Sequence, residues 1–232
     1  MSRLLFLSFL AISQFTPGPD TVRAAGNEAT PGSPPEKAVC QVCFMIGEGA
    51  TPEKVKASTV FKGTPYYFCS RECQKIFETD PAGFVLSEFP STAPSFSVRD
   101  LEGNALDRGS FNDRILLLDF WATWCKPCVK TMPALAALQQ KYKDKLVVLG
   151  ISIDENPETV RKYVAKHAPG YQIAVDDTVA PAWQVYRVKV VPTAFLIDAG
   201  GTMAGRWVGP SDGRRIGEAI DSLLALPDQR AK

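Results

Sequence analysis

The sequence of 232 residues has only one histidine and almost no excess charge, since 26 Lys and Arg face 25 Asp and Glu for a net charge of +1. His167 therefore has no second histidine with which to share a metal ion. The charge balance gives no electrostatic basis for binding nucleic acid or an acidic membrane surface. The apolar run at 4–12 is shorter than the roughly 20 residues that span a bilayer. No internal repeat is visible.

The N-terminal segment nevertheless has the features of an export signal. Arg3 precedes the apolar run, and the small residues Ala24 and Ala25 follow it. We expect residues 1–25 to be a signal peptide or an uncleaved anchor, and 26–37, rich in Pro, Gly and Ser, to be a disordered spacer. The protein is thus expected to be periplasmic or otherwise extracytoplasmic, with membrane contact only through this segment.

The six cysteines form three close pairs, Cys40/Cys43, Cys69/Cys73 and Cys125/Cys128. Such pairing is what metal and redox sites require. Two domains are expected: a cysteine-bearing unit at 38–89 and a larger unit at 93–228, joined by a linker with Pro90 and Pro94.

The third cysteine pair follows an apolar run that predicts a buried strand. Residues 115–119 lead into Phe-Trp-Ala-Thr-Trp-Cys-Lys-Pro-Cys at 120–128, and an amphipathic segment follows. We expect Cys125 near the first turn of that helix, where free backbone N–H groups and the helix dipole favour a thiolate. Cys128, one turn further on, could resolve a mixed disulfide on Cys125. A permanently closed disulfide or half of a zinc site is the alternative.

Apolar and turn patterns predict the other elements of the larger unit. Strands are expected at 95–98, 115–120, 146–153, 171–175, 193–197 and 203–208, and helices at 128–142, 157–167, 179–186 and 212–225. Alternating strands and helices predict an α/β fold with a mixed sheet covered on both faces.

These motifs resemble the TlpA/ResA-like branch of the thioredoxin superfamily over about 93–226. The resemblance rests on Ala-Pro-Ser-Phe at 93–96 and on the Trp-Cys-Lys-Pro-Cys core. It implies a thioredoxin-like fold and an extracytoplasmic thiol–disulfide oxidoreductase. The implied partners are a membrane thiol electron donor and client proteins with disulfides or copper sites, in copper or cytochrome c assembly.

The resemblance also implies roles for residues outside the cysteine pair. Val-Val-Pro-Thr at 190–193 matches a cis-proline loop, in which Pro192 lies beside the cysteines and Val191 presents its backbone to a substrate strand. Trp124 is expected to shield Cys125 and to form part of the contact surface.

Asp119 is a charged residue at the end of the buried run, where burial would raise its pKa. Thioredoxin keeps an aspartate at the matching place as a proton relay for the second cysteine, whereas many TlpA/ResA-like proteins have asparagine there. The alternative is an aspartate that simply finds a polar partner at the strand end.

The first four cysteines flank a predicted hairpin, with strands at 55–61 and 64–68 around Lys62 and Gly63, and a short helix follows. The hairpin would bring Cys40, Cys43, Cys69 and Cys73 together as four thiolates, a ligand set that zinc favours and that also suits Cu(I). Two disulfides are the alternative.

Residues 62–70 and 73–77 resemble the YHS/TRASH family of small metal-binding domains. The resemblance implies zinc or copper at the four cysteines, and no organic cofactor is expected. The competing hypothesis for the whole chain is a metal-binding chaperone whose larger unit mainly docks its partner. A peroxidase is disfavoured because the Thr-x-x-Cys site of that family is absent.

Overall fold

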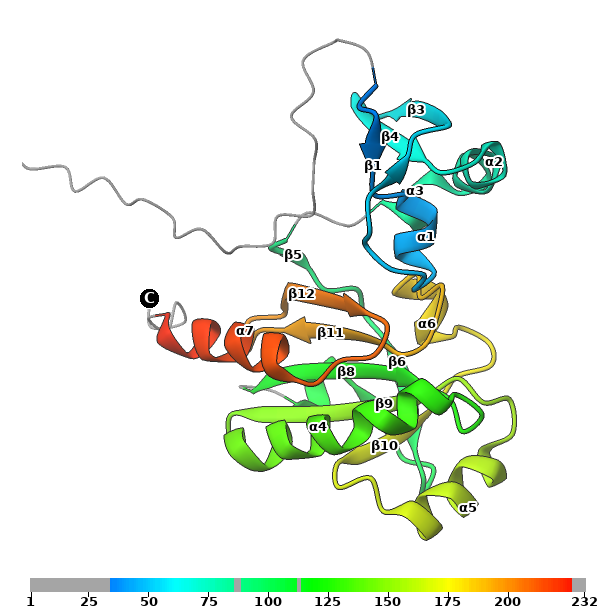
Figure 1. The fold of residues 1–232 in the computed structure, drawn as a ribbon. Coiled ribbons are helices and arrows are strands. Elements are labelled where there is room, and N and C mark those ends of the chain that lie inside the picture. The colour runs from blue at the N-terminus through cyan, green and yellow to red at the C-terminus, as the bar shows by residue number, and fades with distance from the viewer. Residues whose placement is uncertain (1–33, 86–88, 112–113, 227–232) are drawn as a thin grey trace, which may run out of the picture.

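A computed structural model describes residues 34–85, 89–111 and 114–226, arranged as a small N-terminal unit beside a larger one (Figure 1). The expected signal segment 1–25 and most of the expected spacer lie outside these residues. Within them, none of the helices has both the length and the apolar character needed to cross a membrane.

The small unit contains two two-stranded sheets and three short helices. Its elements are β1 (Lys37–Ala38), α1 (Gln41–Met45), β2 (Glu53–Lys54), β3 (Ala57–Phe61), β4 (Thr64–Phe68), α2 (Arg71–Thr79) and α3 (Pro81–Phe84).

The larger unit alternates strands and helices. Its elements are β5 (Ser91–Thr92), β6 (Ser97–Asp100), β7 (Ala105–Asp107), the 3-10 helix η1 (Arg108–Phe111), β8 (Ile115–Trp121), α4 (Lys126–Tyr142), β9 (Leu146–Ser152), α5 (Pro157–His167), β10 (Gln172–Asp176), α6 (Ala182–Val185), β11 (Thr193–Ile197), β12 (Thr202–Val208) and α7 (Arg214–Ala225).

Eight strands of the larger unit form one mixed sheet in the order β5-β12-β11-β8-β9-β10-β6-β7. Strands β8, β9 and β10 are parallel, and the other pairs are antiparallel. Every residue of β8 is buried, as its uninterrupted apolar pattern predicts for a strand covered on both faces. The expected mixed sheet flanked by helices is confirmed.

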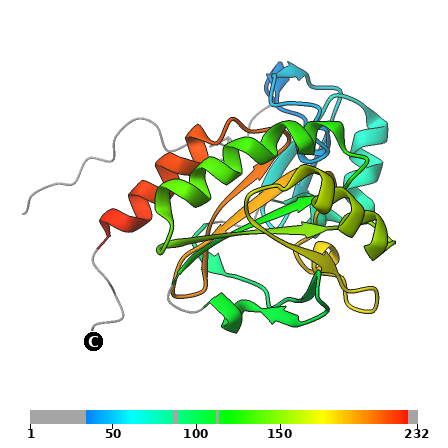
Figure 2. The ribbon, with the colours of Figure 1, turned by 90° about the horizontal axis from the view of Figure 1, so that it is seen from below.

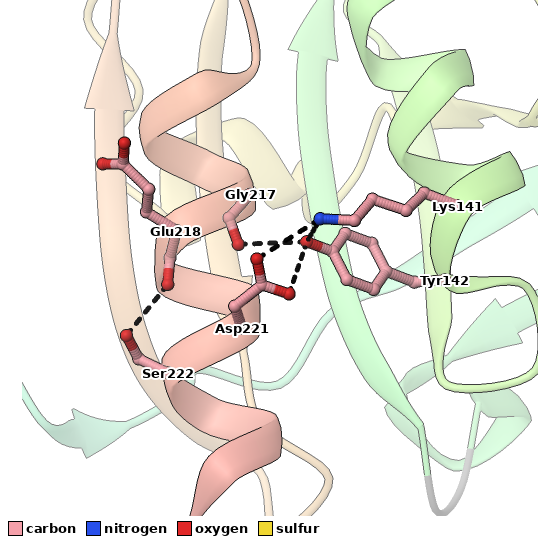
Figure 3. A network of polar contacts seen from close by, with 6 residues as sticks. All are labelled: Lys141, Tyr142, Gly217, Glu218, Asp221 and Ser222. Atoms are coloured by element: carbon pink, nitrogen blue, oxygen red, sulfur yellow. Dashed lines mark hydrogen bonds and ion pairs between the residues drawn. The ribbon is translucent and has the colours of Figure 1, made fainter.

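Helices α4 and α7 lie side by side on one face of this sheet (Figures 1 and 2). Leu135 and Leu138 of α4 and Ile216 and Ile220 of α7 belong to one buried cluster with β8 and β9. At its edge, the Tyr142 hydroxyl donates to Asp221 at 2.8 Å, and Lys141 pairs with the same carboxylate at 3.3 Å (Figure 3). Helix α6 packs on the opposite face, where Ala182 joins a second cluster.

Two expected elements of the larger unit differ from the structure. The linker is partly strand, because β5 pairs with β12 and Ala93 donates to the Gly201 carbonyl at 3.0 Å. The helix expected at 179–186 shortens to α6, because the Asp177 side chain accepts from the Val179 N–H at 2.6 Å and holds a loop there. Asp176 then accepts from the first N–H groups of α6.

The small unit is built on the predicted hairpin. Lys62 and Gly63 both have positive φ, 49° and 79°, as a two-residue turn matching strand twist requires. Phe77 of α2 has no exposed surface and packs its ring against Phe61, Tyr66, Phe68 and Phe84. This aromatic centre holds α2 onto the hairpin.

Candidate active site and metal centre

The redox cysteines lie where β8 gives way to α4. Cys125 is the N-cap residue of α4, and its Sγ accepts a hydrogen bond from the Cys128 N–H at 3.2 Å. The two form a disulfide with an S–S distance of 2.08 Å. A cysteine at a helix N-cap exchanges its disulfide beside free N–H groups that stabilise negative charge. The local arrangement expected from the sequence is therefore present.

A loop before β11 forms the wall beside Cys125. The Val191–Pro192 peptide bond is cis, as expected, and the Val191 carbonyl oxygen lies 3.6 Å from Cys125 Sγ. Trp124 is 67% exposed next to the buried Cys125, whereas Trp121 is fully buried. Trp124 thus lies on the surface beside the cysteine pair, where a client contact was expected, and Trp121 belongs to the core.

Asp154, which follows β9, holds the corner between β8 and α4. Its carboxylate accepts from the Thr123 N–H at 2.8 Å and from the Thr123 hydroxyl at 2.7 Å. Ser152 donates to the same carboxylate at 2.6 Å. The partner lies 31 residues from Thr123, so only the pairing of β8 with β9 brings them together.

Asp119 lies in β8 and its side chain is buried. Burial raises its pKa to about 7, while a hydrogen bond from the Tyr171 hydroxyl, at 3.1 Å, opposes this rise. Tyr171 packs against the cluster that contains Cys125 and Cys128. The polar partner considered from sequence therefore exists, and it connects Asp119 to the surroundings of the redox pair.

Gly150 in β9, the register partner of Asp119, makes room for this hydrogen bond. A Cβ added at Gly150 would lie 2.9 Å from Tyr171 Cε2 and 2.7 Å from Ile173 Cδ1. Such contacts are too close, so a larger residue would displace the tyrosine from Asp119.

The other four cysteines meet in the small unit. Cys40 is the N-cap residue of α1, Cys43 lies in α1, Cys69 follows β4, and Cys73 lies in the first turn of α2. Their sulfur atoms all lie within 4.8 Å of one another, and all four thiols are free. The alternative of two disulfides is not what the structure contains.

The sulfur spacing fits a tetrahedral ion. Cys43 Sγ lies 3.5 Å from Cys69 Sγ and 3.9 Å from Cys73 Sγ, and Cys69 and Cys73 are 3.7 Å apart. Zinc–sulfur bonds of about 2.3 Å place tetrahedral thiolates about 3.8 Å apart. Ser70 caps α2 by accepting from the Cys73 N–H at 3.1 Å and so fixes one ligand.

The thiols differ in how readily they ionise. Burial opposes ionisation of Cys40, but hydrogen bonds from the backbone and side chains of Cys43 and Cys69 outweigh it and lower its pKa. Burial raises the pKa of Cys43 and raises that of Cys69 to about 12. The cluster opens to solvent through a cavity of about 260 Å³, lined by Cys40, Cys43, Glu48, Gly49, Thr51, Glu53 and Cys69.

Comparison with known proteins places this chain among thiol–disulfide oxidoreductases. The model of the AhpC/TSA family matches residues 90–206. Thiol-disulfide oxidoreductase ResA of Bacillus thuringiensis is 33% identical over 137 residues, which are 59% of this chain and 79% of the relative. Thioredoxin-like protein YneN of Bacillus subtilis is 32% identical over 56% of this chain and 76% of its own length.

Solved structures agree with these relatives. A Chlorobium tepidum protein described as a thiol:disulfide interchange protein DsbE has 28% identity and a TM-score of 0.55, covering 59% of this chain and 97% of that one. A thioredoxin from Neisseria meningitidis has 29% identity and a TM-score of 0.54, covering 60% and 93%. The expected thioredoxin-like fold is thereby confirmed for the larger unit.

Proposed function

We propose that this chain, which belongs to the AhpC/TSA family, is an extracytoplasmic enzyme that reduces client disulfides and carries a metal ion in its small unit. That it is a thiol–disulfide oxidoreductase follows from its relatives. The observation that carries the proposal is the Cys125–Cys128 pair at the start of α4 beside the Val191 carbonyl.

In the proposed mechanism, the Cys125 thiolate attacks a client disulfide and forms a mixed disulfide with one client sulfur. The other client sulfur leaves as a thiolate. Cys128 then attacks Cys125 Sγ, closes the Cys125–Cys128 disulfide and releases the second client thiol. The client gains two electrons and the enzyme loses two, so a thiol donor of the membrane must reduce the pair again.

The reducing direction is tested by the reduction potential. DsbA is a strong oxidant because its reduced form is stabilised. Here Lys126 and Pro127 lie between the two cysteines, without a histidine. We expect a potential near that of thioredoxin, about −270 mV, in equilibrium with dithiothreitol. A value near the about −120 mV of DsbA would make the protein an oxidant instead.

We further propose that Asp119 exchanges a proton with Cys128, because Tyr171, which donates to Asp119, packs against the cluster that contains Cys128. A carboxyl group with a pKa of about 7 is suited to accept a proton at neutral pH. Tyr171 then acts as a positioning residue, because its hydroxyl fixes the carboxylate.

Asp119→Asn should remove the inflection near pH 7 from the rate of the resolving step. It should also change stability. A carboxyl pKa of about 7 in the folded chain, against about 3.9 when unfolded, makes the folded state lose stability as pH rises from 4 to 7. Urea unfolding should therefore show the variant gaining stability relative to wild type at pH 8, by up to about 4 kcal/mol, and gaining little at pH 4.

Tyr171→Phe provides the matched variant for this prediction. The Tyr171 hydrogen bond favours ionised Asp119, so its loss should move the inflection to higher pH. An unchanged pH–rate profile in both variants would leave Asp119 with a packing role only.

We propose that Cys40, Cys43, Cys69 and Cys73 hold zinc or copper. Their free thiols and spacing support this ligand set, and the resemblance to YHS/TRASH domains agrees with it. A bound ion would cross-link α1, β4 and α2 by thiolate bonds. Clients with disulfides or copper sites, including those of cytochrome c assembly, are the proposed partners.

The same cluster supports a second candidate, a metal-binding chaperone that uses the larger unit mainly to dock its partner. The two candidates differ in one measurable property, since only the enzyme requires Cys125 for turnover of disulfides.

A further inference from the structure

The small unit contacts the loop at 187–191, which leads into the cis proline. Lys189 Nζ lies 2.7 Å from Asp80 Oδ2 and 5.1 Å from the centre of the Phe84 ring. The next residue, Val190, lies beside Gly47, where an added Cβ would be in ordinary van der Waals contact with Val190 Cγ1 at 3.5 Å. Two adjacent loop residues thus lie against two separate points of the small unit, Asp80 and Gly47.

Each of these points lies within two residues of the end of a helix that carries a cluster cysteine. Gly47 lies two residues beyond α1, which contains Cys43, and the Glu48 N–H donates to the Cys43 carbonyl at 2.9 Å. Asp80 is the first residue after α2, which contains Cys73. The relative orientation of α1 and α2 therefore sets the distance between Gly47 and Asp80, the two residues that the loop contacts.

On its inner side the loop is held by the larger unit itself. Thr193 donates its hydroxyl hydrogen to the Val190 carbonyl at 2.6 Å, and the Val188 N–H donates to the Trp183 carbonyl at 2.8 Å. Val191, whose carbonyl lies beside Cys125, follows Val190 directly. The contacts of Lys189 and Val190 with the small unit can therefore change the position of the Val191 backbone without unfolding the redox site.

We propose that Lys189 and Val190 couple metal binding at the four cysteines to client binding at Val191. An ion bound by Cys43 and Cys73 fixes α1 against α2, fixes Gly47 and Asp80, and so orders the loop. Metal-loaded protein then binds protein clients more tightly than metal-free protein, and by reciprocity a bound client raises metal affinity. Lys189 is a positioning residue in this scheme, which rests on the proposed metal site and on the proposed client contact of Val191.

The first test is hydrogen exchange of the loop amides at 187–191. It uses the full chain carrying Cys125→Ser and Cys128→Ser, so that added Zn²⁺ meets only the cluster thiols. Zinc should slow this exchange about fivefold or more, the lower end of typical coupling factors. Lys189→Met and Asp80→Asn should abolish the effect, and asparagine retains an acceptor for the Gly83 N–H that Asp80 caps at 3.0 Å.

Lys141→Met is the matched control. It removes another Lys–Asp ion pair, with Asp221 on α7 (Figure 3), at the end of α4 opposite to Cys128. In this background zinc should still slow exchange as it does in the unsubstituted loop. An equal zinc effect in Lys189→Met and in Lys141→Met would overturn the proposal.

The second test separates client binding from sulfur chemistry. Reduced protein with its redox pair intact is mixed with insulin or with oxidised glutathione, with and without one equivalent of Zn²⁺. Zinc should speed the single-turnover oxidation of the Cys125/Cys128 pair by insulin about fivefold. It should leave the rate with oxidised glutathione unchanged, because only a protein client is long enough to contact the Val191 loop. Equal acceleration of both reactions would contradict coupling through the loop.

The outcomes also distinguish the coupling from the proposed metal site on which it depends. Stoichiometric zinc binding without any change in hydrogen exchange of the loop amides would contradict the coupling but not the proposed metal site. Failure of the double-serine chain to bind either Zn²⁺ or Cu(I) would remove both.

Discussion

Cys125→Ser should lower disulfide turnover by at least about a thousandfold, because a serine hydroxyl is not ionised at neutral pH and cannot form a disulfide. Cys128→Ser should instead stop the reaction halfway. Cys125 would still attack, but the mixed disulfide with the client would accumulate, since no second thiol resolves it. Both effects are measured with insulin, by turnover and by non-reducing electrophoresis.

Val129→Ser is the matched control for these variants. Val129 follows Cys128 on α4 and is exposed, so the substitution changes the same helix turn without touching either sulfur. It should turn over nearly as fast as wild type. Turnover retained in Cys125→Ser would remove the proposed attacking group and favour the chaperone that only docks its partner.

Phe77→Ala should unfold the small unit, with a loss of about 3–5 kcal/mol, as expected for deleting a fully buried aromatic ring. Four other aromatic rings pack on Phe77, and among the described residues the cluster it centres has six buried members. The cysteines of α1 and α2 would separate. Metal content after anaerobic purification should fall from one ion per chain to none.

The neighbouring Ile76→Ala is the control, because Ile76 lies on the same helix and is 45% exposed. It should keep the ion. In Phe77→Ala the normally buried Cys40 should react quickly with a thiol reagent, while the Cys125–Cys128 pair still reduces oxidised glutathione, since the larger unit has its own core. Protection of Cys40 in Phe77→Ala would contradict this account.

The redox motif could be predicted because its signals are local. An apolar run, a cysteine at a helix start and a second cysteine one turn later all lie within fifteen residues. The hairpin and its turn at Lys62 and Gly63 are local in the same sense. The cis bond at Pro192 was accessible only through the family resemblance, because most X–Pro bonds are trans.

The supporting residues could not be found in this way because they come from distant parts of the chain. Asp154 reaches Thr123, and Tyr171 reaches Asp119, only once β8, β9 and β10 pair in register. Likewise, nothing near Lys189 in the sequence indicates that it meets Asp80 across 109 residues. Such contacts depend on tertiary packing that no local pattern encodes.

The short edge strands of the sheet affect where extended polypeptides can pair with this protein. At its two margins the eight-stranded sheet ends in β5 and β7, with two and three residues. Long unpaired margins would recruit unfolded chains and lead to aggregation. A thiol–disulfide oxidoreductase must meet such chains while they are still misfolded. Strands this short leave little backbone for stray pairing at β5 and β7 themselves, which favours pairing of an incoming strand at the proposed client contact, the Val191 backbone beside Cys125.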